Sequence, residues 1–292
     1  MMTRIDGFIQ REPDDGESSV QRTEAYVAYD QLNFYVVFLA FDDEPHNVRA
    51  NLSPRESIWD DDKIGITIDT FNDQRTAYMF RANPLGVQQD ARWREGGRMD
   101  TSYESVWYSE GRLTDQGFMV QFAIPFRSLR FSESDEQIWG IQVEREIVRL
   151  SENSFWPAYS RSVEGRLNQV ATLVGIDDVS PGRNIQLVPF AFVRDFEVLD
   201  SKAKDGPGFT KDTEDNFGLD AKFVFGDSMV LDATINPDFS QVESDQPQVT
   251  VNERFEVRFP ERRPFFLENS DYFSTERRLV FTRRIKDPQA GV

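Results

Sequence analysis

The sequence predicts an all-β protein, a β-sandwich followed by the antiparallel strands of an incomplete β-barrel. Three observations lead to this fold class. Short apolar runs separated by turn residues recur through the first 180 residues. Two segments between residues 217 and 235 alternate apolar and polar side chains with a period of two, which is the period of a strand. Helical periodicity is weak, apart from one short turn expected at 126–131.

The first predicted domain, residues 1–180, has the strand spacing of a sandwich. We place its end at the Pro181-Gly182 pair, because these two residue types interrupt regular structure. Turns at 30–33 and 115–117 each join two neighbouring strands. The expected strands are 23–29, 34–41, 64–69, 77–83, 106–113, 118–125 and 139–147.

The second predicted domain, residues 181–292, contains the strands of the barrel. The stretch 200–216 is rich in Gly, Lys and Asp and is expected to form a long mobile loop. A hairpin follows it around the tight Gly226-Asp227 turn. The expected strands are 185–193, 217–225, 229–235, 249–259 and 279–284.

The two hairpin strands have the length and pattern of transmembrane barrel strands. Such strands take about 9–11 residues and carry one apolar face. Four or five strands cannot close a barrel, which needs about eight. We therefore expect part of an outer-membrane protein, with the barrel truncated in this chain.

Composition excludes several functional classes. The net charge of −18 opposes nucleic-acid binding, because phosphates would repel such a chain. The absence of Cys removes disulfides and thiolate metal sites, and the single histidine, His46, leaves no basis for a histidine triad. Neither a Gly-rich phosphate loop nor a nucleophile elbow is present.

The expected location is the outer membrane, the cell surface or the periplasm. No apolar run is long enough for a transmembrane helix. Residues 1–10 lack the apolar core of a signal peptide, so we expect the natural N-terminus to lie outside this chain.

Several long motifs resemble one family of Gram-negative outer-membrane proteins. The segment 236–252, Asn-Pro-Asp-Phe-Ser-Gln-Val-Glu-Ser-Asp-Gln-Pro-Gln-Val-Thr-Val-Asn, is similar to that family, as is 260–269, Pro-Glu-Arg-Arg-Pro-Phe-Phe-Leu-Glu-Asn. The N-terminal half agrees through 7–16, 69–78, 83–90 and 124–131. Members have an N-terminal domain like the family 9 carbohydrate-binding module and a C-terminal β-barrel domain of unknown function. The family also has a strand before Gly7, for which residues 1–6 are too short.

The resemblance implies a sugar site. Trp59 matches a sugar-stacking tryptophan, Trp156 a second stacking aromatic, and Arg81 a hydroxyl-binding arginine between them. This chain departs from the module at Gly65, where family members carry a Glu. Trp93 is a further candidate, expected in a loop. Aromatic rings and planar polar groups suit the two kinds of surface that a pyranose presents.

Each of these residues also has a plainer interpretation. Trp59 and Trp156 could be packing residues, and Trp107 and Trp139 are expected in the core. Asp60 and Asp62 are candidate calcium ligands, because calcium prefers carboxylate oxygens. A solvated turn is favoured there, because consecutive strand residues point to opposite faces.

The leading hypothesis is binding of a polysaccharide or oligosaccharide at the outer membrane, linked to carbohydrate catabolism. We expect no enzymatic activity. The alternative is hydrolysis of glycosyl bonds, for which 51 acidic residues single out no carboxylate pair. A further alternative is a structural or heme-binding sandwich, with heme held by Met79, Met99 or Met119.

Overall fold

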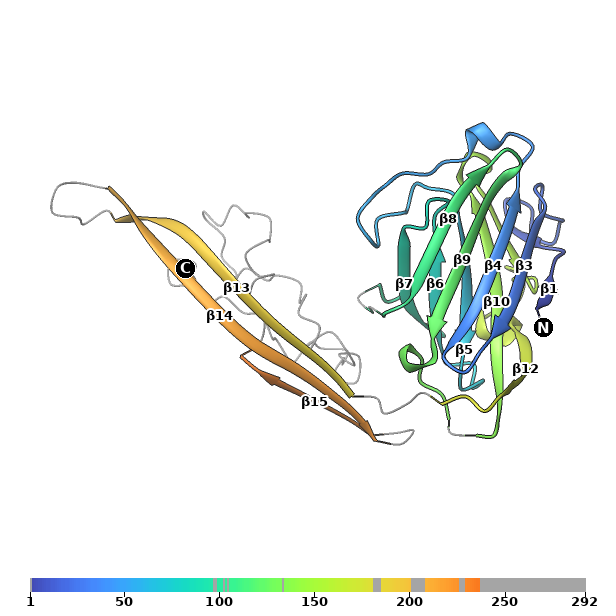
Figure 1. Cartoon of the computed structure of the whole chain (residues 1–292). Coiled ribbons are helices and arrows are strands. Elements are labelled where there is room, and N and C mark those ends of the chain that lie inside the picture. Colours follow the sequence, from blue (N-terminus) through green and yellow to red (C-terminus); the bar gives the residue numbers. More distant parts are fainter. Residues whose placement is uncertain are drawn as a thin grey trace. The chain divides into compact units, whose positions relative to one another are not determined.

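The computed structural model describes residues 2–96, 99–101, 103, 105–132, 134–180, 185–200, 208–225 and 229–236. It divides into two compact units, Met1–Arg183 and Asn184–Val292. The first unit is drawn in blue to yellow and the second begins in yellow and orange (Figure 1). The described residues form strands and short 3-10 turns and contain no α-helix.

The first unit contains two antiparallel sheets. One has five strands in the order β1 (Thr3–Ile5), β3 (Thr23–Tyr29), β4 (Asn33–Phe41), β9 (Gly117–Pro125), β8 (Tyr108–Thr114). The other has seven: β2 (Ile9–Glu12), β11 (Glu152–Trp156), β10 (Glu136–Ile147), β5 (Lys63–Asp69), β6 (Thr76–Ala82), β7 (Gln88–Arg94), with β12 (Ala171–Asp177) paired to β10. The 3-10 turns are η1 (Pro45–Asn47), η2 (Phe126–Ser128), η3 (Val148–Leu150) and η4 (Leu167–Gln169).

The two sheets enclose one aromatic-rich core. Phe38 from β4 packs edge-on against Phe122 from β9, with ring centroids 5.5 Å apart, and Trp107 lies 4.9 Å from Phe122. Trp139 of β10 is fully buried among Phe34, Phe126 and Phe131. The predicted core positions of Trp107 and Trp139 are therefore confirmed. Each such ring contributes about 2–3 kcal/mol by burial.

The predicted all-β fold, a sandwich followed by antiparallel strands, is confirmed. All seven strands expected in the first domain are present, within a few residues of the expected bounds. The sequence analysis missed five short strands, β1, β2, β7, β11 and β12. Residues 1–6 do supply a strand, the three-residue β1, which pairs with β3.

The second unit is described over three strands, β13 (Ile185–Asp200), β14 (Gly208–Phe225) and β15 (Met229–Ile235). They pair in antiparallel order, β13 with β14 and β14 with β15. The prediction of a loop throughout 200–216 is wrong for 208–216, because these residues continue β14 and pair with β13. The strands expected at 249–259 and 279–284 lie outside the described residues.

No helix among the described residues is long and apolar enough to cross a membrane.

Candidate functional site

The candidate site lies on the face of the seven-stranded sheet that points away from the core. On β5, Ile64, Ile66 and Ile68 are buried in the core, so the alternate residues Gly65 and Thr67 face outward. The strand register places Arg81 of β6 and Glu144 of β10 on either side of Gly65. Three adjacent strands therefore bring an arginine, a glycine and a glutamate into one row.

Gly65 allows the two charged side chains of this row to meet. Arg81 Nε donates a hydrogen bond to Glu144 Oε1 across β5. A Cβ atom at position 65 would lie 2.7 Å from Arg81 Cγ, 2.9 Å from the Phe80 carbonyl oxygen and 3.1 Å from Glu144 Oε1. Any larger residue would separate the pair. The glycine that departs from the resembled family is thus what this ion pair requires.

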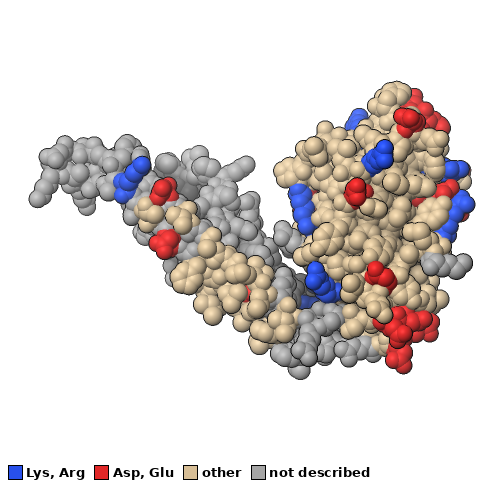
Figure 2. All heavy atoms as spheres, in the orientation of Figure 1, with Lys and Arg blue, Asp and Glu red and all other residues tan. Residues whose placement is uncertain are grey.

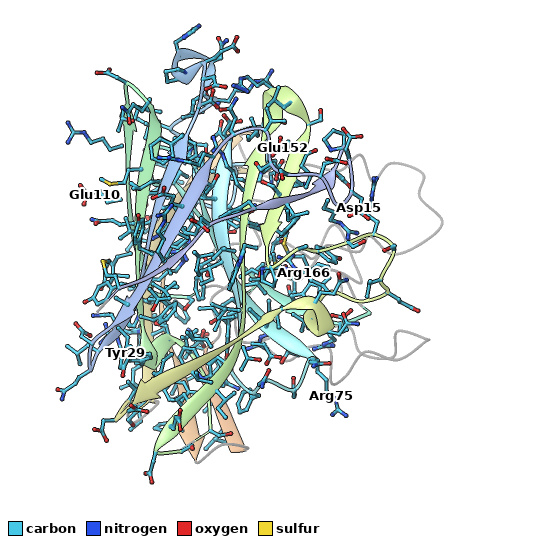
Figure 3. The ribbon with its side chains drawn as sticks, turned by 90° about the vertical axis from the view of Figure 1, so that its right-hand side faces the viewer. Asp15, Tyr29, Arg75, Glu110, Glu152 and Arg166 are labelled. Atoms are coloured by element: carbon cyan, nitrogen blue, oxygen red, sulfur yellow. The ribbon has the colours of Figure 1, made fainter. Side chains whose placement is uncertain are left out.

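A second arginine, Arg166, approaches the same glutamate from the segment between β11 and β12 (Figure 3). Its guanidinium donates to Glu144 Oε2 at 3.0 Å, to Gln142 Oε1 at 2.9 Å and to Thr67 Oγ1 at 2.9 Å. The backbone N–H groups of Arg166 and Leu167 donate to the Glu95 carboxylate. These bonds fix the segment around η4 against the sheet.

The two arginines keep Glu144 ionised. Burial by itself would raise the pKa of Glu144, but the charges of Arg81 and Arg166 and their hydrogen bonds outweigh it and hold this pKa at about 2. The guanidinium of Arg166 also lies over three aromatic rings, 5.2 Å from the centroid of Trp93 and 5.4 Å from those of Phe155 and Tyr159. The row therefore combines fixed charges with aromatic surface.

Trp59 is the exposed aromatic residue of the site. It lies in the segment before β5, and 53% of its surface is exposed. Its backbone carbonyl accepts a hydrogen bond from the buried Lys63 amine at 3.2 Å, and this amine also forms an ion pair with Glu146 at 3.0 Å. The Lys63–Glu146 row is adjacent to the Arg81–Glu144 row on the same face. Trp59 thus stands at the border of the charged face.

The structure separates Trp156 from this face. Trp156 pairs with Val143 and packs against the hydrophobic core, whereas its neighbour Phe155 pairs with Glu144 on the outer face. Because side chains alternate along a strand, Trp156 and Arg81 lie on opposite faces of the sheet. The expected clamp of Trp59 and Trp156 around Arg81 is not formed, and Trp156 has its packing role.

Trp93 lies in a strand and not in the expected loop. It belongs to β7, where its half-buried ring lies beside Arg166. Its indole N–H points to Glu95 Oε2 at 3.4 Å. Trp93 is therefore part of the outer face, although a charged side chain occupies one side of its ring.

The candidate calcium ligands diverge. Asp62 is buried, and its two oxygens accept the backbone N–H groups of Val148 and Arg49. Asp60 is exposed, while Asp61 between them binds Asn51 and Asn83. The described residues contain no group of three or more acidic or histidine side chains placed to hold a metal ion. These aspartates fix the loop onto the sandwich instead.

Sequence reasoning missed Glu144 and Arg166. Their contacts join strands and loops far apart in the chain, so no local pattern identifies them. One local signal was available, the isolated glycine in the β-branched run of β5, since a glycine inside a strand often marks close approach of other groups.

Comparisons with known proteins give three findings. A family model for a domain of unknown function, DUF5916, matches residues 185–291. This position is where the resemblance predicted a domain of unknown function. No curated protein matches the chain.

Two solved structures are similar to the chain. A candidate carbohydrate-binding protein from Bacteroides uniformis has 13% identity and a TM-score of 0.47, covering 59% of this chain and 86% of the other. A family 9 carbohydrate-binding module from Caldicellulosiruptor kristjanssonii, solved with cellotriose, has 12% identity and a TM-score of 0.36. That match covers 52% of this chain and 71% of the module.

Proposed function

We propose that the sandwich binds a polysaccharide or oligosaccharide on the outer face of its seven-stranded sheet. The observation that carries the proposal is the exposed ring of Trp59, whose backbone carbonyl accepts a hydrogen bond from Lys63 in the row next to Arg81 and Glu144. A flat aromatic surface suits the C–H face of a sugar ring, and fixed charged groups suit its hydroxyls.

The rigidity of the site favours a binding function. Arg81 and Lys63 are held by partners within the sheet, and Glu144 is held by Arg81 and by Arg166, so their polar atoms are oriented before a ligand arrives. A site that is already ordered loses less conformational entropy on binding. Figure 2 shows the side of the sandwich that carries β3, β4, β8 and β9, with scattered basic residues and a group of acidic residues at its lower end.

Glycan binding by residues 1–183 tests this function. We expect the Trp59→Ala variant to lose at least tenfold in affinity, equivalent to about 1.4 kcal/mol. The matched control is Leu52→Ala, which removes another exposed apolar side chain from the same segment and should bind like the unmodified protein. Equal affinity of Trp59→Ala and the control would contradict the proposed site, and absence of binding to any glycan would contradict the function.

Hydrolysis of glycosyl bonds would require two carboxylates facing a common space. Glu56 and Asp90 form a close pair, but Asp90 is buried and both of its oxygens already accept hydrogen bonds from Arg55, Ser105 and Trp107. We therefore favour binding without catalysis, as a means of retaining glycans for catabolism by other proteins.

We also propose that the second unit inserts into the outer membrane. One face of its sheet is apolar on all three strands, and six of its large side chains are more than half exposed. They are Ile185, Leu187, Val193, Phe217, Leu231 and Ile235. On β13 the apolar positions extend over nine residues, which agrees with the roughly 9–11 residues of a tilted membrane strand.

The same face changes character beyond this band. Val193 pairs with Asp215, and Asp195 then accepts a hydrogen bond from the Thr213 hydroxyl at 2.7 Å. This strand pair is apolar over one membrane thickness and polar beyond it. Such a pattern suits a strand pair that crosses the membrane and extends past its surface into water. Light scattering of residues 1–292 and 1–183 tests this: only the longer chain should need detergent, and equal monodispersity without detergent would contradict insertion.

A further inference from the structure

A carboxyl pair outside the proposed sugar site closes the free edge of the seven-stranded sheet. Strand β7 is the last strand of that sheet, so its outer backbone groups need other partners. The Glu56 N–H donates to the Gln88 carbonyl at 2.9 Å, and the Asp90 N–H donates to the Glu56 carboxylate at 3.2 and 3.3 Å. Glu56 thus takes the place of a neighbouring strand.

The contacts between the segment 51–59 and β7 bring two acidic groups together. We call this arrangement of the segment its closed position. Arg55 Nε lies 3.2 Å from both Glu56 Oε1 and Asp90 Oδ1, so the two carboxyl groups share one donor. Asp90 is fully buried, whereas the Glu56 side chain is 24% exposed. A second ionised carboxylate beside a buried one is unfavourable, and a single arginine compensates only in part.

The backbone at Glu56 is also strained. Its φ angle is +69°, in the left-handed region that residues with a Cβ atom rarely adopt. The side-chain contacts of Glu56, together with the Arg55–Asp90 ion pair, hold this part of the segment against its local preference. If those contacts weaken, release of this strain favours opening.

From this arrangement we infer that Glu56 and Asp90 form a proton-operated latch on residues 51–59, closed while the pair retains a proton and loosened when the proton is lost. The segment it controls ends at Trp59. The latch would therefore determine how firmly the proposed sugar-stacking residue is held in place. The inference itself concerns the position of the segment and does not depend on which ligand Trp59 meets.

The surroundings of Glu56 place the transition near neutral pH. Burial, followed by the charge of Asp90, raises the pKa of Glu56 to about 7. Charged groups at the latch are Arg55 on the same segment, and Asp90 and Arg92 on β7. The segment after β7 adds Tyr103, whose pKa burial raises, and the uncharged Ser105 and Trp107.

The sign of the effect follows from linkage. The pKa of Glu56 is higher in the closed position than in water, so the closed position binds more protons. Its stability relative to the open position is greatest at low pH and falls as the pH rises from about 4.5 to about 7. Between pH 5.5 and 7.5 the open population should rise on the order of tenfold.

Hydrogen exchange of the full chain in detergent tests the latch. After correction for the intrinsic rate, peptides covering residues 51–59 should lose on the order of tenfold in protection between pH 5.5 and 7.5. The Glu56→Gln variant cannot ionise, so its protection should not change with pH. Glu110→Gln, which alters an exposed glutamate on β8, is the matched control and should behave like the unmodified protein.

Two results would overturn the inference. One is unchanged protection of 51–59 in the unmodified chain across this pH range, a measurement that needs no variant to fold. The other is a Glu56→Gln variant that loses protection with pH as the unmodified chain does. Glycan binding plays no part in this readout, so failure of the latch and failure of the proposed function can be told apart.

Discussion

At the scale of single residues, Glu144 is the group on which the outer face depends. It is almost completely buried and accepts hydrogen bonds from two arginines on different elements. An isolated buried charge is very costly, and removing one partner of such a pair leaves the other uncompensated. The arrangement therefore fixes protonation states as well as positions.

The first prediction concerns the acid stability of Glu144. Because its pKa is about 2 in the folded protein, against 4.5 for the exposed group, Glu144 stabilises the fold above pH 4.5. This contribution, roughly 3 kcal/mol, is lost as the pH falls from about 4.5 to about 2. Urea unfolding of residues 1–183 at a series of pH values should show this loss.

Two variants make the assignment specific. Glu144→Gln should lower the free energy of unfolding at pH 7 by about 3–5 kcal/mol and flatten its dependence on pH below 4.5. Glu110→Gln, at an exposed position where Gln121 donates a hydrogen bond to the carboxylate, should change neither quantity appreciably. An unchanged acid profile in Glu144→Gln would show that other carboxylates dominate acid unfolding.

At the scale of elements, the sequence predicts strands well where alternation continues between clear turns. The hairpin of β3 and β4 has apolar residues at regular intervals and a polar turn at 30–33, so its bounds are nearly correct. Strands β2 and β11 were missed because they are short and polar. The pairing of β2 with β11 comes from contacts across more than 130 residues of chain, which no local pattern reveals.

The same reasoning explains the error at 208–216. Its composition, dominated by Thr, Asp and other polar residues, favours a loop, but the register of β13 with β14 continues from Ile185 to Asp200. A ladder already in register adds one residue pair after another, which outweighs weak local preference.

Trp59 and Arg81 could be selected from sequence, whereas Arg166 could not, because its contacts arise only on folding.

The second prediction concerns the apolar face of β14. Phe217 is among its most exposed side chains, and a lysine there would have to enter hydrocarbon if this face meets lipid. We expect Phe217→Lys to reduce insertion into phospholipid vesicles, at a cost of up to about 2–4 kcal/mol at the bilayer centre. Co-flotation of the full chain with vesicles measures insertion.

Thr213→Lys supplies the control for that substitution. It places the same charge on the same face of β14, but in the polar region beyond the apolar band, beside Asp195. Vesicle binding should be retained. If the two lysine variants float equally well, the apolar face does not contact lipid and another surface must cover it.

At the scale of the whole molecule, the two units have different sources of stability. All strand pairing of β1 to β12 is internal to the sandwich, and so is its core of buried aromatic and branched residues. The described strands of the second unit instead leave a broad apolar face exposed. The first unit therefore has a buried core of its own, and the proposed membrane insertion would cover the apolar face of the described strands of the second.

The last prediction follows from this difference. Residues 1–183 should unfold in one cooperative transition, with a Tm within a few degrees of the sandwich transition of the full chain in the same detergent. A 1 kcal/mol change would shift the Tm of a unit this size by about 2–4 °C, so scanning calorimetry can detect even a modest contribution from the second unit. A Tm lower by 10 °C or more in the isolated sandwich would mean that residues after 183 stabilise it. The sandwich would then not be an independently stable unit.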